Sequence, residues 1–373
     1  MLERVKKILR FISLYGIGRT LFKVAGHMRW NMPLVWKRGT SDVVIIGCGQ
    51  YGFATIGYYL TRAFGRRVSH CYDIDKAKST SLARMLGVPN VVTSPNEAFL
   101  DRKVKYVYIA SNHASHTDYA ITALSHGKMV YVEKPVAVSF QQLVAINEAA
   151  SSKQDKIFVG YNRPWSKAIQ CLKARMHPYS GAISLNCFVS GHKIDKDHWY
   201  RNPEEGTRIC GNAGHWIDLF VHMVSWRGEF PNCVELNLVS ASAAEPDDNF
   251  ILSITTDIGD IFSLMLTART EPFEGINETV NIQWGDVIAK IDDFRQMQVW
   301  HGAQKSKHRY WPKDVGHRLS ILQPFNSEHC RNWSEVLIST ILVLHTTELV
   351  CSGKSSMSVD LAHEVAKINS GIK

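Results

Sequence analysis

The sequence predicts an α/β protein in which an N-terminal doubly wound parallel sheet precedes an α+β domain with a large, mostly antiparallel open sheet. Up to residue 138, short β-branched runs alternate with helical segments that end at glycines, as in successive β-α-β units. After Pro135, strand-like runs follow one another with few helices between them, which favours an antiparallel sheet open on one face. With 373 residues, the chain is long enough for two domains that each have a core.

The strongest motif joins the first strand to the first helix of the parallel sheet. Val43 to Ile46 are four consecutive β-branched residues, which is typical of a strand buried on both faces. In a Rossmann fold, the glycines of a G-x-G-x-x-G loop allow a tight turn, the close approach of a pyrophosphate and close packing of the next helix. The sequence therefore predicts dinucleotide binding by the loop at 47–52, through Gly47, Gly49, Gln50, Tyr51 and Gly52.

Dinucleotide binding also requires an acidic residue after the second strand, and the sequence has one. A second strand, Val68 to Tyr72, leads into Asp73, whose distance of about 20 residues from the loop is the spacing at which a carboxylate holds the adenosine ribose. A carboxylate there repels a 2'-phosphate, so NAD is favoured over NADP. Lys76 and Lys78 follow closely and keep NADP as the less favoured alternative. An ordinary β-α-β unit without a ligand is the remaining alternative.

The other predicted elements follow in chain order. In the parallel sheet they are a helix at 79–86, strands at 91–92 and 104–110, a helix at 116–126 and a strand at 129–132. In the second domain they are a helix at 139–150, strands at 157–161, 183–189, 234–241, 250–256, 261–267, 279–284 and 287–291, and helices at 336–349 and 358–368. The helix at 336–349 is too short and too polar to span a bilayer.

From these elements we predict that the chain is divided into four parts. They are a basic amphipathic extension over 1–40, the parallel-sheet domain over 41–138, the α+β domain over 139–353, and a C-terminal helix over 354–373 that could return to the first domain. The eight cysteines are scattered without paired spacing, which indicates free thiols in a reducing cytosol and predicts no metal site.

The net charge of +9 lies almost entirely in the extension. Residues 1–40 contain nine basic residues and a single acid, Glu3, while the rest of the chain is nearly neutral, so nothing indicates a nucleic-acid binder. Val5, Ile8, Leu9 and Ile12 share one face of a predicted helix over 2–15 that is neither a signal peptide nor a transmembrane span. The helix either packs on the protein itself or on a second subunit, which we favour, or docks to an anionic membrane surface or a partner enzyme.

Between residues 106 and 135 the chain reads Tyr-Val-Tyr-Ile-Ala-Ser-Asn-His-Ala-Ser-His, then a helix, then Gly-Lys-Met-Val-Tyr-Val-Glu-Lys-Pro. This pattern resembles the Gfo/Idh/MocA family of dehydrogenases. The segments 159–163 (Val-Gly-Tyr-Asn-Arg) and 215–218 (His-Trp-Ile-Asp) resemble the start of the family's second domain and its His-x-x-Asp helix. The similarity covers roughly residues 41–373. The run 197–206 resembles a branch with sugar oxidoreductases tied to surface polysaccharides.

The resemblance implies a hydride transfer between NAD and a hydroxyl or carbonyl carbon of a sugar, cyclitol or nucleotide sugar. Lys134, at the end of a strand, can move the proton if burial lowers its pKa, and Glu133 can orient it. Pro135 would fix the turn that presents the cofactor's amide side. His215 is then the partner acid/base or a substrate ligand. Asp218, three residues on, shares its helical face and can orient the imidazole or share the substrate's hydroxyls.

By the same resemblance, the nicotinamide ribose lies beside the segment Ser111, Asn112, His113 and His116. Candidate substrate ligands are Tyr161, Arg163, His198 and Asn212. Asn212 stands where related sequences commonly carry an acid, and an amide cannot tune the histidine by charge. His198 with Trp199 could equally be a packed aromatic pair, and His215 a core or capping histidine.

Two other functions share these features. One is a glycosidase that retains NAD and oxidises C3 transiently, and the other is a non-catalytic, NAD-responsive binding or regulatory protein. In each case we expect a small-molecule sugar partner, a homodimer or homotetramer paired through the open sheet, and a cytoplasmic protein, with peripheral contact at the inner membrane surface as the alternative.

Overall fold

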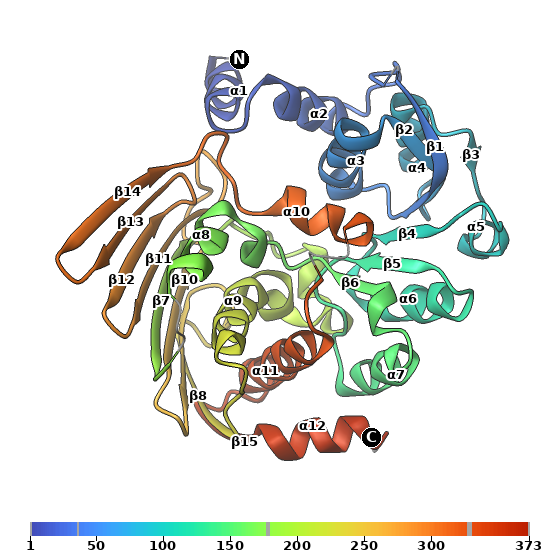
Figure 1. The fold of residues 1–373 in the computed structure, drawn as a ribbon. Helices are drawn as coiled ribbons and strands as arrows, with labels where there is room; N and C mark the ends of the chain where they lie inside the picture. The colour runs from blue at the N-terminus through green and yellow to red at the C-terminus, as the bar shows by residue number, and fades with distance from the viewer. Residues whose placement is uncertain (1, 36, 177–179, 327–329, 372–373) are drawn as a thin grey trace.

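The computed structural model describes residues 2–35, 37–176, 180–326 and 330–371, and it contains the two predicted sheets (Figure 1). The first sheet has six parallel strands in the order β3-β2-β1-β4-β5-β6. This is the strand order of a Rossmann fold. The strands are β1 (Arg38–Ile46), β2 (Arg66–Tyr72), β3 (Asn90–Val91), β4 (Tyr106–Ile109), β5 (Met129–Val132) and β6 (Ile157–Val159).

The central strand β1 is buried on both faces, as its β-branched run predicts. Val44 and Ile46 belong to the larger hydrophobic core, whereas Val43 and Ile45 belong to the second core on the opposite face of the sheet. Helices cover both faces. They are α3 (Gly57–Phe64), which continues the π-helical turn η1 (Gly52–Ile56), and α4 (Lys76–Leu86), α5 (Pro95–Leu100), α6 (His116–Ser125) and α7 (Phe140–Ala150).

The parallel sheet extends beyond the predicted boundary at residue 138. The strand expected at 157–161 is β6, which pairs in parallel with β5 through Val132 and Val159. The helix that we assigned to the second domain is the crossover α7, with Ser139 as its N-cap. A helix between two parallel strands of one sheet is a β-α-β unit, so residues 139–159 complete the first sheet.

The second sheet has nine strands in the order β14-β13-β12-β11-β7-β10-β9-β8-β15, and only β7 and β10 pair in parallel. Its strands are β7 (Ile183–Ser190), β8 (Cys233–Ser240), β9 (Phe250–Thr256), β10 (Ile261–Thr267), β11 (Asn277–Trp284), β12 (Val287–Asp292), β13 (Gln296–His301), β14 (Gln304–Arg309) and β15 (Ser356–Asp360). On one side, α8 (Lys167–Arg175), α9 (Gly214–Val224) and α11 (Trp333–Ser352) cover the sheet (Figure 1). Buried and exposed residues alternate along β7 and β8, so the other face is open to solvent.

The sequence did not predict β13, β14 and β15, or the short helix α10 (His317–Leu322). β14 reads Gln-Lys-Ser-Lys-His-Arg and lies at the edge of the sheet, where polar strands are common but give no hydrophobic alternation to recognise. The C-terminal helix α12 (Leu361–Asn369) lies against α7, with Asn147 donating a 3.1 Å hydrogen bond to Asn369.

The helix α11 is longer than predicted. By length and composition its 20 residues could cross a membrane. However, 67% of the apolar 18-residue stretch within this helix is buried inside the protein. It packs against α9 and carries the buried residues Ile341 and Val343 of the main core. It is therefore a core helix.

The N-terminal extension contains two helices, α1 (Leu2–Tyr15) and the unpredicted α2 (Ile17–His27). Phe22 and Ala25 of α2 lie in the core beside Phe53 of η1, so α2 is a part of the first domain. The end of α1 is tied to the second domain, since the backbone N–H of Lys313 donates to the carbonyl oxygen of Leu14 at 2.8 Å. The extension therefore bridges both domains and is not the separate appendage that the charge pattern indicates. Trp36, in the predicted extension, lies outside the described residues.

Candidate active site

The glycine loop has the geometry that a dinucleotide needs. Gly47 has φ +91°, and a Cβ there would lie 2.3 Å from the carbonyl oxygen of Ala110. A Cβ at Gly52 would lie 2.2 Å from the carbonyl oxygen of Gly47, so the turn and the helix packing both require glycine. A Cβ at Gly49 would meet nothing within 4 Å, which leaves room for a pyrophosphate in front of the loop.

Asp73 is held in place at the end of β2. Its carboxylate accepts hydrogen bonds from the backbone N–H groups of Cys48, at 2.7 Å, and Asp75, at 2.9 Å. This arrangement fits the ribose of a dinucleotide bound over the loop. The side chain of Gln50 points elsewhere, because its Nε2 donates to the carbonyl oxygen of Lys23 in α2 at 2.9 Å. Only the backbone of Gln50 is therefore available to a phosphate.

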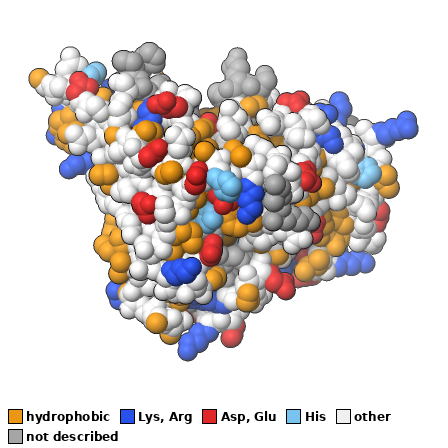
Figure 2. All heavy atoms as spheres, turned by 90° about the horizontal axis from the view of Figure 1, so that it is seen from below, with side chains coloured by type: hydrophobic (Ala, Val, Ile, Leu, Met, Phe, Trp, Pro, Cys, Tyr) orange, Lys and Arg blue, Asp and Glu red, His pale blue; other side chains and the backbone are white. Residues whose placement is uncertain are grey.

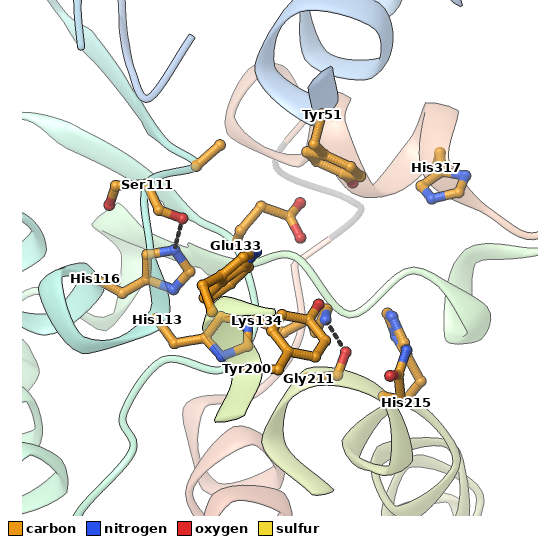
Figure 3. A pocket seen from close by; sticks show the side chains of 13 residues that line it. Tyr51, Ser111, His113, His116, Glu133, Lys134, Tyr200, Gly211, His215 and His317 are labelled. Atoms are coloured by element: carbon orange, nitrogen blue, oxygen red, sulfur yellow. Dashed lines mark hydrogen bonds between the residues drawn. The ribbon is translucent and has the colours of Figure 1, made fainter. Parts of the chain in front are cut away.

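A cavity of about 220 Å³ lies between the carboxyl ends of β4 and β5 and the second domain. In Figure 3, His113 and His116 lie on one side of it and His215 and His317 on the other. The cavity is lined by Tyr51, Ala110, Ser111, His113, His116, Glu133, Lys134, Trp199, Tyr200, Gly211, Asn212, His215 and His317.

Lys134 follows β5 directly and precedes Pro135 through a cis peptide bond. Its Nζ donates a 2.6 Å hydrogen bond to the carbonyl oxygen of Gly211 in η7 (Ile209–Ala213) (Figure 3). Burial lowers the pKa of Lys134 to about 8, and the neighbouring Glu133 partly opposes that shift. The amine can therefore both hold and release a proton near neutral pH.

Glu133 is buried behind Lys134. Its Oε1 accepts a 2.8 Å hydrogen bond from the hydroxyl of Tyr131. Burial raises its pKa to about 7, against the influence of Lys134. A Cβ at Gly160 would lie 2.5 Å from the same oxygen, so the glycine that follows β6 makes room for the carboxylate.

His215 lines the cavity, but Asp218 does not join it there. The Nδ1 of His215 is buried and has no hydrogen-bond partner among the described residues. Burial lowers its pKa well below the usual value, and Arg163 and Lys134 lower it further, so the imidazole is neutral. The carboxylate of Asp218 instead accepts hydrogen bonds from Arg331 at 2.6 and 2.8 Å and from Ser339 at 3.0 Å.

The prediction that Asp218 orients His215 or contacts substrate is therefore wrong. Two of the four predicted substrate ligands also have structural partners. Arg163 forms a buried bidentate ion pair with Glu278, at 2.8 and 3.0 Å, and lies over the ring of Trp216. His198 caps η5 (Trp199–Arg201) through the N–H of Tyr200, and its ring packs on the neighbouring rings.

The other two predicted substrate ligands remain near the site. Asn212 lines the cavity. Tyr161 lies behind His215, with ring centroids 6.3 Å apart, and its buried hydroxyl has no hydrogen-bond partner among the described residues.

The predicted ribose segment is only partly in the cavity. Ser111, His113 and His116 line it, whereas Asn112 donates from Nδ2 to Glu205 at 2.8 Å. The Nδ1 of His116 lies 2.8 Å from the carbonyl oxygen of Pro135 and its Nε2 lies 3.2 Å from that of Ser111, and the single N–H of a neutral imidazole can donate to one of them. Burial lowers its pKa to about 4, so this histidine is a neutral positioning residue for the loop.

Sequence reasoning missed four lining residues of the second domain, Trp199, Tyr200, Gly211 and His317. Trp199 and Tyr200 follow the predicted His198, and only the aromatic run itself could have indicated them. A Cβ at Gly211 would lie 2.4 Å from the ring of Tyr200, so that ring lies directly on η7. His317 follows Gly316, whose φ of +91° and close approach to Asn162 fix the turn, and no local pattern marks it as a site residue.

Comparison with known proteins supports this geometry. Residues 41–161 match the oxidoreductase family with an NAD-binding Rossmann fold. The scyllo-inositol 2-dehydrogenase (NAD(+)) of Bacillus subtilis strain 168 is 26% identical over 182 residues, which are 48% of this chain and 51% of that protein. The inositol 2-dehydrogenase of Burkholderia ambifaria strain MC40-6 is 29% identical over 136 residues, 36% of this chain and 40% of that protein. The matches thus span about half, or less, of these curated relatives.

Solved structures share most of the fold. A levoglucosan dehydrogenase in complex with NADH and levoglucosan superposes with a TM-score of 0.69 at 18% identity, over 85% of this chain and 99% of that one. An oxidoreductase domain protein from Kribbella flavida gives a TM-score of 0.70 at 15% identity, over 86% of this chain and 100% of that one. With both sheets, the glycine loop and the Glu-Lys-Pro turn in place, residues 41–161 are identified as the NAD-binding Rossmann domain of the Gfo/Idh/MocA oxidoreductase family, and the chain shares the two-domain fold of these solved structures.

Proposed function

We propose that this protein is an NAD-dependent dehydrogenase that oxidises a CH–OH group of a sugar, a cyclitol or a nucleotide sugar, or reduces the corresponding carbonyl. One observation carries the proposal: Lys134 and His215 line a single cavity at the carboxyl ends of the strands that follow the glycine loop. The inositol dehydrogenases and the levoglucosan dehydrogenase among the relatives support a polyhydroxylated substrate.

The glycine loop and Asp73 would hold the cofactor. The open space at Gly49 suits a pyrophosphate, and the carboxylate of Asp73, fixed by two backbone N–H groups, suits ribose hydroxyls. Because that carboxylate would repel a 2'-phosphate, NAD is favoured over NADP. When bound, NAD supplies the acceptor for a hydride from the carbinol carbon.

Lys134 would move the proton. In the oxidation its neutral amine accepts the proton of the substrate hydroxyl, and in the reduction its ammonium returns one to the carbonyl oxygen. The pKa of about 8 suits both directions near neutral pH. An ammonium has three N–H donors, so the bond to Gly211 orients Lys134 and leaves donors for the substrate oxygen.

The second domain would select and orient the substrate. The neutral imidazole of His215 lines the cavity, where a ring nitrogen suits a hydroxyl beside the reacting carbon. The amide of Asn212 can bind another hydroxyl, and the rings of Trp199 and Tyr200 can pack against the apolar face of a sugar. The resemblance of residues 197–206 to sugar oxidoreductases of surface polysaccharides supports nucleotide sugars as one substrate class to test.

We also propose a homo-oligomer that pairs through the open face of the nine-stranded sheet, and a cytoplasmic location. Large apolar side chains are exposed on that face, among them Val239, Ile251 and Ile261. Exposed apolar side chains on adjacent strands are a common basis for contacts between subunits.

The decisive experiment follows NADH absorbance with NAD and a panel of inositols, monosaccharides, levoglucosan and nucleotide sugars. We expect NAD reduction that depends on one substrate class and is lost in Lys134→Ala. The proposal fails if calorimetry detects neither NAD nor NADP binding and neither molecule co-purifies. Release of free sugar without net NADH would instead identify an NAD-retaining glycosidase, and NAD binding without any turnover a regulatory protein.

A further inference from the structure

The two N-terminal helices expose apolar stripes that the protein itself leaves uncovered. On α2, Ile17, Leu21, Val24 and Met28 follow the spacing of one helical face. Ile17 and Met28 are each 72% exposed and Leu21 is 38% exposed. On α1, Val5, Ile8 and Leu9 are exposed as well, with Leu9 at 60%. The helix α2 packs on the protein through its other face, so the stripe is not needed for folding.

The helix α1 packs on the protein itself, as we favoured from the sequence, but it leaves Val5, Ile8 and Leu9 of its apolar face exposed. The contacts that α1 makes with the second domain come largely from polar groups and the end of the helix. Arg10 pairs with Glu274, the indole N–H of Trp311 donates to the carbonyl oxygen of Ser13 at 2.9 Å, and Leu14 is the one fully buried side chain among those described on α1.

A groove of about 640 Å³ separates the two helices from the 271–275 loop. Apolar side chains line it, including Phe11, Val24 and Phe273, together with Lys7 and Lys23. The Nζ of Lys23 lies 4.1 Å from the centre of the Phe11 ring, and that of Lys7 lies 5.8 Å from the Phe273 ring. Apolar surface and cations are therefore interleaved on one face.

Basic residues outnumber acidic ones in this part of the chain, with nine in residues 1–40 against the single acid Glu3. The acids of the groove are already paired, Glu271 with His192 at 2.7 Å and Glu274 with Arg10. No ion pair is recorded for Lys6, Lys7 or Lys23 within the described residues. Figure 1 shows α1 and α2 together at one end of the molecule. The face seen from below in Figure 2 instead has acidic, basic and apolar side chains interspersed.

We propose that the outer face of α1 and α2 is a docking surface for an anionic lipid bilayer, in which the apolar stripes enter the interface and the lysines contact lipid phosphates. Exposed apolar side chains beside basic ones are the pattern of helices that lie in the membrane interface. The excess of basic residues favours an anionic bilayer over a second copy of the chain, because two copies of the same positively charged surface repel each other.

The docking surface is a rigid part of the fold. The end of α1 is bonded to Trp311 and Lys313 of the second domain, and α2 contributes Phe22 to the core of the first domain. A bilayer would therefore hold the whole enzyme in one orientation. Deleting residues 1–40 would remove core residues, so substitutions on the exposed stripes are the proper test.

The experiment is flotation of the full-length protein with vesicles of phosphatidylcholine, with and without phosphatidylglycerol. We expect binding only to the anionic vesicles, and weaker binding as salt is added, since salt screens the attraction. The double variant Ile17→Ser/Met28→Ser should bind at least about tenfold more weakly, because two exposed apolar anchors are lost. Leu100→Ser is the matched control, since Leu100 is 67% exposed on α5.

A charge test complements the apolar one. Lys6→Glu/Lys7→Glu should lose binding to anionic vesicles, whereas Arg102→Glu/Lys103→Glu, with the same change of charge on exposed side chains elsewhere, should keep it. NAD binding should be unchanged in every variant, which confirms folding. The proposal is overturned if the wild type does not float with anionic vesicles, if both members of a pair lose binding equally, or if Ile17→Ser/Met28→Ser breaks up an oligomer in solution.

Discussion

The Nζ of Lys134 and the carbonyl oxygen of Gly211 are 2.6 Å apart, and their hydrogen bond joins the end of β5 to η7 of the second domain. The position of this amine therefore depends on both domains. The ring of Tyr200, which fits against Gly211 only because glycine has no Cβ, fixes the acceptor from the other side. The proposed proton carrier is thus placed where the cofactor domain and the substrate domain meet.

Replacing this amine should remove the proton transfer and leave the cofactor site intact. We expect Lys134→Ala to lower kcat by at least about 10²-fold, as for the loss of a general acid/base, with NAD affinity near that of the wild type. Steady-state kinetics and calorimetry measure the two quantities. Lys103→Ala, on an exposed loop, is the control. Full activity in Lys134→Ala would refute the assignment.

The pKa of Lys134 predicts opposite pH profiles for the two directions. Because oxidation needs the neutral amine, kcat/KM for oxidation should rise with pH until the pH passes about 8. Reduction needs the ammonium, so its rate should fall above the same pH. Lys134→Arg, which keeps the charge but cannot release the proton, should lose this pH-dependent step together with most of the activity. A profile in the wild type that is flat around pH 8 would contradict the prediction.

The sequence predicted those parts of the site whose chemistry is local. Gly47 and Gly52 are recognisable because the backbone itself excludes a Cβ, and Lys134 because it stands in a short motif. The roles of Asp218 and Arg163 could not be predicted, because their partners Arg331 and Glu278 are 113 and 115 residues away along the chain. A spacing of three residues places two side chains on one helical face, but it does not say which distant group competes for them.

The same distinction holds for the fold. Strands with β-branched runs or clear alternation were predicted close to their observed bounds, as for β5 and β9. The helix α2 was missed because its exposed face is apolar and its core contact is made by few residues, Phe22 and Ala25 among them. The boundary at residue 138 was placed too early because the short strand β6 shows no sign, in its own sequence, of which sheet it joins.

The loop glycines should respond differently to substitution. Gly49→Val adds a side chain into open space, so the protein should fold normally and bind NAD at least about tenfold more weakly. Gly52→Val forces a Cβ against the carbonyl oxygen of Gly47 and should destabilise the first domain. Urea unfolding and calorimetry together separate the two effects. Normal NAD binding by Gly49→Val would place the pyrophosphate elsewhere.

Replacement of Asp218 should lower the stability of the folded protein. Its removal leaves Arg331, a buried cation, with Glu335 as its remaining ion-pair partner among the described residues. We therefore expect Asp218→Ala to lower the free energy of unfolding by about 3 kcal/mol, as for other buried ion pairs that lose one partner. Asp286→Ala removes an exposed pair with His301 and should have almost no effect. A variant of Asp218 with wild-type stability and greatly reduced kcat would restore the catalytic role that the sequence indicates.

The open face of the nine-stranded sheet should hold subunits together. Val239 is 65% exposed and Ile261 is 51% exposed on this face, at β8 and β10. We expect the wild type to be a dimer or tetramer by light scattering, and Val239→Lys/Ile261→Lys to be a monomer, because burying unpaired charges at an apolar contact is costly. Lys103→Glu is a control for the change of charge. A monomeric wild type at micromolar concentration would show that the sheet does not serve as an interface, whereas a stable oligomer that survives the double variant would move the contact to another surface.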